Sequence, residues 1–226
     1  MRYDLIAWDF NGTVVDDADV GMGATNILLA RRGLPVIPSR EVYYRLFGFP
    51  IVDYYRRLGF DFEKESYDDI ANEWIPEYRR LEKKAPLREG VLALLERFSS
   101  LGIPQVILSA SEESMLAEQL SDLGISRFFT KIYGRSDYHG SDKTALALAL
   151  AADHPAARIL FIGDTDHDAA CAKAAGFDCA LMLDGHQSRE RLVACGCPMF
   201  ENYAALSAHL SEMGLELREG GAIYGL

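Results

Sequence analysis

Short, almost continuously apolar runs alternate along this chain with helical segments that have recognisable ends. Apolar runs of this kind are typical of parallel strands that are covered on both faces. We predict strands at residues 4–9, 103–108, 159–162 and 179–183, and helices at residues 88–100, 112–123, 142–152 and 166–175. Ser111 precedes one of these helices, and Gly124 and Gly176 follow two of them, as expected for capping residues. The alternation predicts an α/β fold with a doubly wound parallel sheet.

Residues 17–86 interrupt this alternation, because they contain no convincing buried strand. Aromatic residues are dense there, and the sequence predicts helices at residues 26–34, 39–47, 51–58 and 66–84. Ser66 and Asp69 have the spacing of a capping box. We therefore predict a Rossmann-like core of residues 1–16 and 87–226, with a helical cap of residues 17–86 inserted after the first strand.

The charge of the chain limits its partners. It carries 23 basic and 34 acidic side chains, a formal net charge of −11, which argues against a nucleic-acid or membrane binder. An anionic substrate stays possible, because a bound divalent cation inverts the local field. No apolar run approaches a membrane span and no signal peptide is apparent, so we expect a cytoplasmic protein whose four cysteines are free and reduced.

Asp9 follows the first apolar run and leads into an Asn11-Gly12-Thr13 turn. A carboxylate there is costly to desolvate unless a metal, a cation or hydrogen-bond donors meet it. The end of a central strand is also where open α/β sheets place their chemistry. An Asn-Gly pair between apolar segments is equally a strong hairpin signal, so both interpretations remain open from this segment alone.

Three further segments carry polar groups at predicted strand ends or helix starts. They contain Ser109, Lys143 and the acidic run from Asp164 to Asp168. Parallel strands place their carboxyl ends on one edge, so these groups are expected to converge with Asp9. A carboxylate, a hydroxyl, a lysine and an acidic cluster suit phosphoryl transfer through an aspartyl-phosphate, and hard oxygen ligands favour magnesium.

This set of motifs, in this order, resembles the haloacid dehalogenase-like hydrolase superfamily, and the resemblance covers nearly the whole chain. It implies that Asp9 is the nucleophile and a Mg²⁺ ligand, and that the backbone carbonyl of Asn11 is a second ligand. Asp164 would be the third protein ligand, and Asp168 would support the metal site. The cap looks like that of the subgroup with phosphoglycolate phosphatase, β-phosphoglucomutase, phosphonatase and 2-haloacid dehalogenase.

The same resemblance implies that Ser109 and Lys143 bind the transferring phosphoryl group. Thr13 would shape the turn and orient the nucleophile. Arg45, in the cap, is our candidate for contacting an anionic or polar group of the substrate, and a solvated arginine on a helix face is an equal alternative.

Each of these residues also has a purely structural interpretation. Asp9 could cap the turn, Ser109 could cap a helix and Lys143 could be a solvated first-turn lysine. Asp164 and Asp168 could be acidic residues that complement a helix dipole. Asp166 leaves the assignment within its segment open, and His167 is interpreted as incidental, because a magnesium site has little use for imidazole.

Asn11 departs from the family pattern, in which phosphatases carry an aspartate that acts as general acid and base at this position. A neutral amide hydrogen-bonds but does not exchange a proton at working pH. The enzyme would then be slow, or another group would supply the proton, or the protein would bind rather than react. Deamidation of the Asn-Gly pair would restore an aspartate.

The other chemistries of the subgroup fit less well. Phosphonatase needs a cap lysine, and Lys64, Lys83 and Lys84 lie in no recognisable setting. Dehalogenases do not need the metal-binding acids, and mutases use the missing aspartate directly. The sequence favours a magnesium-dependent hydrolase of a small phosphorylated metabolite, similar to phosphoglycolate phosphatase and either monomeric or homodimeric. The alternative is a weakly active relative that binds a phosphate ligand or a protein partner.

Overall fold

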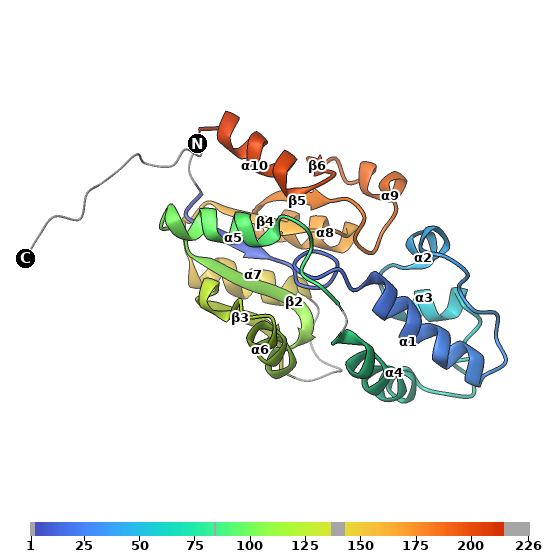
Figure 1. Cartoon of the computed structure of the whole chain (residues 1–226). Coiled ribbons are helices and arrows are strands. Elements are labelled where there is room, and N and C mark those ends of the chain that lie inside the picture. Colours follow the sequence, from blue (N-terminus) through green and yellow to red (C-terminus); the bar gives the residue numbers. More distant parts are fainter. Residues whose placement is uncertain (1–2, 84, 137–142, 215–226) are drawn as a thin grey trace, which may run out of the picture.

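Six parallel strands form one sheet in the order β3-β2-β1-β4-β5-β6 (Figure 1). The computed structural model describes residues 3–83, 85–136 and 143–214. The strands are β1 (Leu5–Trp8), β2 (Gln105–Glu112), β3 (Lys131–Arg135), β4 (Ile159–Gly163), β5 (Asp178–Met182) and β6 (Met199–Phe200). Both neighbours of β1 are parallel to it, so the hairpin interpretation of the Asn-Gly turn is wrong. The predicted α/β fold is confirmed.

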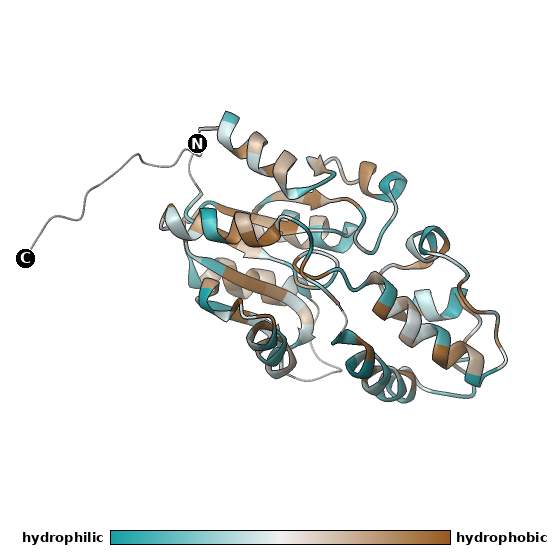
Figure 2. Ribbon diagram, viewed as in Figure 1, coloured by the Kyte–Doolittle hydropathy of each residue, from teal (hydrophilic) through white to brown (hydrophobic). Residues whose placement is uncertain are grey.

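Helices cover both faces of the sheet. They are α5 (Val91–Ser100), α6 (Glu113–Asp122), α7 (Lys143–Asp153), α8 (Asp166–Ala175), α9 (Arg189–Val193) and α10 (Tyr203–Glu212), with a 3₁₀ turn at Ser126–Phe128. Alternate residues of β1 face opposite sides, as strand geometry requires. Ile6 and Trp8 pack in the cluster that contains α5, α6 and α10, whereas Leu5 and Ala7 pack in the cluster of α7 and α8. Figure 2 shows the hydrophobic character of β2, which lies between these layers.

The two edge strands were not predicted from the sequence. β3 contains two basic residues, and its exposed and half-buried positions break the continuous apolar pattern. β6 has only two residues. An edge strand pairs on one side only and needs less apolar surface, so its signal is weaker than that of β1 or β4.

Four helices connect β1 to α5 and form what we call the helical insert. They are α1 (Ala18–Arg31), α2 (Arg40–Leu46), α3 (Ile51–Arg57) and α4 (Tyr67–Glu82). They enclose a hydrophobic cluster of their own, with Leu28 and Ile70 fully buried. The Ser66–Asp69 capping box at the start of α4 is present as predicted. In the part of the chain that the structure describes, no helix has the length and hydropathy to cross a membrane.

Helix α1 begins at Ala18, eight residues before the predicted start at residue 26. Two glycines, Gly21 and Gly23, lower the helix propensity of this first part. Tertiary packing overrides this propensity, because Val20 and Ala24 are buried against Tyr78 of α4.

The two connections between the sheet and the helical insert lie side by side. Val15 forms an antiparallel bridge with Leu87. The Asp16 amide donates to the Pro86 carbonyl at 2.9 Å, and the Arg88 amide donates to the Val14 carbonyl at 3.0 Å. The insert therefore leaves and rejoins the core at one place. The division at residues 16/17 and 86/87 into two domains stays a prediction.

Candidate active site

Three carboxylates meet at the carboxyl edge of the central strands. Asp9 follows β1, Asp164 follows β4, and Asp168 lies in the first turn of α8. One oxygen from each lies within 4.8 Å of the others, and all three side chains are buried. β1 and β4 are neighbouring parallel strands, so their ends necessarily lie together. The structure thus brings together the acidic residues that the sequence predicted to converge.

Lys143 at the start of α7 joins this group. Its Nζ atom lies 2.5 Å from an oxygen of Asp9 and 2.5 Å from an oxygen of Asp168. Burial alone would lower the pKa of Lys143, but the charges of Asp168 and Asp9 outweigh it and raise the pKa. Lys143 is therefore held as a cation, and the interpretation of this residue as a solvated lysine is wrong.

The contacts of Lys143 and the burial of the site move the pKa values of Asp9 and Asp168 in opposite directions. Burial raises the pKa of Asp168, but Lys143 and the hydrogen bonds from Thr165 outweigh burial, so this pKa lies below its usual value. Burial raises the pKa of Asp9 well above its usual value against the opposing charge of Lys143, and the charges of Asp168 and Asp164 add to the rise. Asp9 is thus the carboxyl that most needs a further positive charge to stay ionised.

Asp164 is held by donors from two loops. The Thr13 hydroxyl donates to one of its oxygens at 2.9 Å, and the His186 amide donates to the other at 2.7 Å. A Cβ atom at Gly12, where φ is +73°, would overlap both Asp164 and the His186 ring. Thr13 was expected to shape the turn and orient the nucleophile. Its hydroxyl contacts Asp164, and the orienting role stays a prediction.

Asp166 lies apart from the three carboxylates. Its carboxylate accepts from Arg191 at 2.7 Å and from Gln187 at 2.8 Å. Asp168 forms a capping box with Thr165, so it serves both as a helix-cap residue and as a partner of Lys143. The structural interpretation of Asp168 and the functional one are therefore compatible.

Ser109 is buried and lies within β2 rather than after its end. The strand continues to Glu112 past an irregularity in its pairing with β3. Glu112, not Ser111, caps α6, and the Ser111 hydroxyl instead donates to the Asn11 side chain at 2.9 Å.

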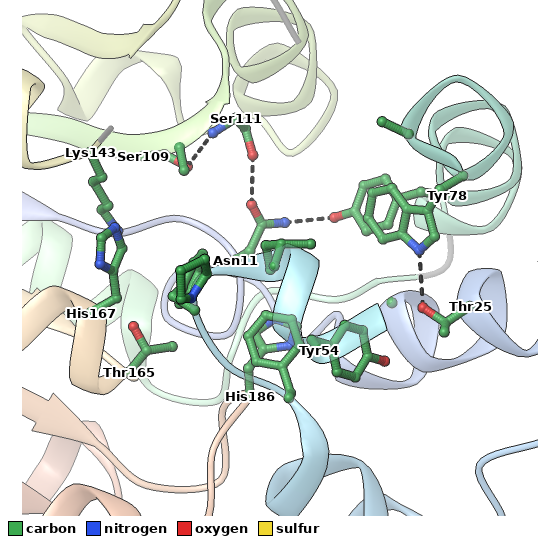
Figure 3. Close-up of a pocket in the computed structure, with 18 of the residues that line it drawn as sticks. Asn11, Thr25, Tyr54, Tyr78, Ser109, Ser111, Lys143, Thr165, His167 and His186 are labelled. Carbon is green, nitrogen blue, oxygen red and sulfur yellow. Dashed lines mark hydrogen bonds between the residues drawn. The ribbon is translucent and has the colours of Figure 1, made fainter. Parts of the chain in front are cut away.

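The Asn11 amide is fully engaged by its neighbours. Its nitrogen donates to Asp17 at 2.8 Å and to the Tyr78 hydroxyl at 2.6 Å, while its oxygen accepts from Ser111. Figure 3 shows Ser111 and Tyr78 bound to opposite ends of this amide. Tyr78 belongs to the insert and Ser111 to the core, so Asn11 connects the two.

A buried charge pair lies beside Asn11. Asp17 accepts from the His186 ring nitrogen at 3.1 Å, and the other ring nitrogen lies 2.8 Å from the Tyr43 hydroxyl. Burial lowers the pKa of His186, but the charge of Asp17 outweighs it and raises this pKa to about 9. Burial raises the pKa of Asp17, but its contacts with His186, Tyr78 and Asn11 outweigh burial and bring this pKa below its usual value.

Sequence reasoning identified neither the Asp17–His186 pair nor the contact of His186 with Tyr43. These three residues are far apart in the chain and belong to no motif. Only the folded arrangement of α2 and the loop after β5 brings them together.

A cavity of about 600 Å³ joins these groups to the helical insert. Asp9, Asn11, Ser109 and Lys143 line its core end, and the opposite walls come from the insert. Arg45 is exposed on α2 and is not among the described residues that line the cavity. His167, interpreted as incidental, is a lining residue whose ring stacks on Phe49 at a centroid distance of 4.5 Å.

The donor set at the carboxylate end suits a hard divalent cation. Asp9, Asp164 and Asp168 offer only oxygen ligands, and three carboxylates outnumber the single Lys143 in contact with them. Such a cluster is expensive to bury without further positive charge. The residues present therefore fit a metal of this kind.

The parallel sheet, the carboxylate–lysine centre at its carboxyl edge and the helical insert define an α/β protein with a buried charged centre at the end of a cavity. Comparison with known proteins is more specific. The family model of haloacid dehalogenase-like hydrolases matches residues 6–182, and the chain belongs to this family.

Among curated proteins, the relatives include phosphoglycolate phosphatases. The chain is 29% identical over 182 residues to a phosphoglycolate phosphatase of Neisseria gonorrhoeae, and the aligned residues cover 76% of each chain. It is 26% identical over 190 residues to a phosphoglycolate phosphatase of Pseudomonas syringae, covering 80% of this chain and 70% of the relative. A haloacid dehalogenase-like hydrolase of Streptococcus pneumoniae has the same fold, with a TM-score of 0.74, 22% identity and coverage of 92% and 98%.

Proposed function

We propose that this protein is a magnesium-dependent phosphatase that hydrolyses a small phosphate monoester through an aspartyl-phosphate intermediate. The observation that carries the proposal is the contact of Lys143 with both Asp9 and Asp168 at the end of the cavity. A carboxylate and a buried cation that face one cavity suit nucleophilic attack on an anionic group. The similarity to phosphoglycolate phosphatases supports a phosphate monoester as the substrate class.

Asp9 is the proposed nucleophile. Its carboxylate oxygen forms a bond to phosphorus, the ester oxygen–phosphorus bond breaks, and the departing alkoxide takes up a proton from solvent. Water then attacks phosphorus and gives up a proton to solvent, the bond between phosphorus and Asp9 breaks, and inorganic phosphate leaves. The two steps replace one difficult displacement by water with two easier ones.

The neighbouring residues hold charge and geometry. Lys143 neutralises the phosphoryl oxygens, and Asp168 keeps Lys143 ionised and in place. Ser109 supplies a hydroxyl to the same group, and Thr13 fixes Asp164. Magnesium would be held by Asp9, Asp164 and the backbone carbonyl of Asn11, with Asp168 in support, and when bound it supplies positive charge to the phosphoryl oxygens.

One observation favours a second candidate function. The Asn11 amide is committed to Asp17, Tyr78 and Ser111 and carries no exchangeable acidic proton. These contacts of Asn11 favour, as the second candidate, a catalytically weak family member that binds a phosphate ligand or a protein partner at the same site.

Phosphate release from a panel of phosphate monoesters, with Mg²⁺ and with EDTA, separates the two candidates. We expect Mg²⁺-dependent release by the wild type and none by Asp9→Asn. Asp166→Asn is the matched control, because Asp166 is an acid of the same region that contacts Arg191 instead of the cavity centre. Undiminished hydrolysis by Asp9→Asn would contradict the mechanism, and binding of phosphate without turnover by the wild type would favour the second candidate.

A further inference from the structure

The walls that the insert gives to the cavity are mainly apolar and aromatic, with the hydroxyl groups of Thr25 and of several tyrosines among them. The insert contributes side chains from α3, from α4 and from the loop before α3, among them Phe47, Phe49, Ile51, Val52, Trp74 and Ile75. Figure 3 shows the core residues Ser109 and Lys143 at one end of this space and the aromatic side chains of the insert at the other. A ligand that places its phosphoryl group at Asp9 therefore extends its remaining part into apolar surroundings.

The insert adds no charge to these walls beyond Asp17, which directly precedes α1 and is paired with His186. Among the described residues, the helices α1–α4 and the loops between them contribute no lysine, arginine, histidine, aspartate or glutamate to the cavity lining. The lining cations come from the core. Lys143 contacts Asp9 and Asp168, Arg135 lies on β3 in register with Glu112, and His186 is paired with Asp17. A carboxylate moved from water to the wall formed by Val52, Trp74 and Ile75 would lose its hydration, and α3 and α4 contribute no cation to the lining that would compensate.

The size of the cavity also exceeds what a two-carbon leaving group needs. Cavities of about 300–1,000 Å³ hold ligands of drug size, and this one measures about 600 Å³. A small alcohol at Asp9 would leave much of the apolar wall in contact with water. An aromatic body would cover this wall, which includes the ring of Trp74.

Building on the phosphatase function proposed above, we infer that the leaving alcohol of the substrate carries an uncharged aromatic body that lies between α3 and α4. The phosphoryl group lies at Asp9 and Lys143, and the ring contacts the side chains of Val52, Trp74 and Ile75. The preferred substrate is thus an aryl-alkyl phosphate rather than a phosphate ester with a carboxylate on its alcohol, such as 2-phosphoglycolate.

The test compares benzyl phosphate, ethyl phosphate and 2-phosphoglycolate with Mg²⁺. Benzyl alcohol and ethanol are alcohols of similar acidity, so a difference between their esters reports contacts of the ring rather than leaving ability. Burial of the ring is expected to give benzyl phosphate a kcat/KM about 10- to 100-fold above that of ethyl phosphate. The same preference is expected in binding, with benzylphosphonate a tighter inhibitor than ethylphosphonate.

A charge placed in the wall should reverse the preference. Val52→Lys puts a cation on α3 at a half-buried lining position, so we expect it to lower kcat/KM for benzyl phosphate at least about 10-fold and raise it for 2-phosphoglycolate. Val36→Lys is the matched control, because Val36 is 51% exposed and does not line the cavity. Ile75→Ala removes apolar wall without adding charge, and should lower kcat/KM for benzyl phosphate more than for ethyl phosphate.

The outcomes separate this inference from the proposed function. Equal or better turnover of ethyl phosphate or 2-phosphoglycolate by the wild type would overturn the inference and leave the phosphatase intact. Tighter binding of benzylphosphonate than of ethylphosphonate without phosphate release from any ester would support the inference and overturn hydrolysis. Neither binding nor release would overturn both.

Discussion

At the scale of single residues, Asn11 is where this chain departs from the pattern that its family resemblance implies. The structure gives this residue a role of its own, since its amide nitrogen donates to Asp17 and Tyr78 and its oxygen accepts from Ser111. An aspartate could keep the bond from Ser111 but would lose both donor bonds and face the Asp17 carboxylate. The site is therefore built around an amide, which forms hydrogen bonds that an aspartate at this position would not form.

Asn11→Asp is expected to raise the rate of hydrolysis and to lower stability. A general acid at this position contributes about 10²–10⁴-fold to rate, so an increase of about 10²-fold is expected on a good substrate. Repulsion by Asp17 lowers the thermal midpoint of the variant and raises the pKa of the new carboxyl, which suits a proton donor. Steady-state kinetics and thermal unfolding measure the two effects.

Asn11→Ser serves as the control, because it also removes the amide and adds no acid. An unchanged rate in Asn11→Asp would show that proton transfer at this position does not limit turnover. Deamidation of aged protein should give the same gain, and a mass increase in the peptide that contains residue 11 would identify it.

At the scale of elements, the central strands and the helices that cover them follow from the sequence, and the edges do not. β1 and β4 are buried on both faces and have an unbroken apolar pattern, whereas β3 is half-exposed and β6 is only two residues long. Convergence of Asp9, Lys143 and Asp164 was predictable, because parallel topology fixes the edge at which they meet. The Asp17–His186 pair was not, because its contact depends on how the loop after β5 approaches α1 and no sequence pattern encodes that approach.

This pair should make stability depend on pH. The raised pKa of His186 stabilises the fold fully below its ordinary value of 6.5, and this contribution is lost as pH rises through about 9. The lowered pKa of Asp17 stabilises the fold above its ordinary value of 3.8, and this contribution is lost as pH falls below that value. The pair therefore contributes most between these two ordinary values, by about 3 kcal/mol at most for His186.

Thermal unfolding of the wild type and of His186→Gln, measured in EDTA, tests this prediction. The difference in midpoint should be largest near about pH 5.5 and shrink as pH rises through about 9, in the direction set by linkage. His209→Gln is the control, because His209 is half-buried on α10 far from Asp17 in the chain. A difference that is constant across this range would mean that the pair contributes packing but not charge.

At the scale of the whole molecule, the sheet and the helical insert are packed around separate hydrophobic clusters, and residues of both parts line one cavity. The sheet core contains Ile107 of β2, and the insert core contains Ile70 of α4, and both side chains are fully buried. No side chain belongs to both clusters, although the Asn11 and His186 contacts connect the two parts. Each part is thus stabilised mainly by its own apolar packing.

Shortening a buried side chain in the insert and shortening one in the sheet should therefore loosen different parts of the molecule. Ile70→Ala and Ile107→Ala are each expected to cost about 2–5 kcal/mol in their own cluster. Hydrogen exchange should increase within α1–α4 in Ile70→Ala while the sheet stays protected, whereas Ile107→Ala should increase exchange across the sheet. Equal acceleration of both regions in Ile70→Ala would show that the two cores unfold as one unit.

The adjacent crossings at Val14–Asp16 and Pro86–Arg88 have an evolutionary consequence. Because the two ends of the helical insert are hydrogen-bonded to each other, the intervening segment can be exchanged or lengthened without moving β1 or α5. Recombination at this point would replace the walls that face the leaving alcohol and keep the carboxylates and the lysine. A lineage with this architecture can change what it accepts as substrate while its chemistry is inherited unchanged.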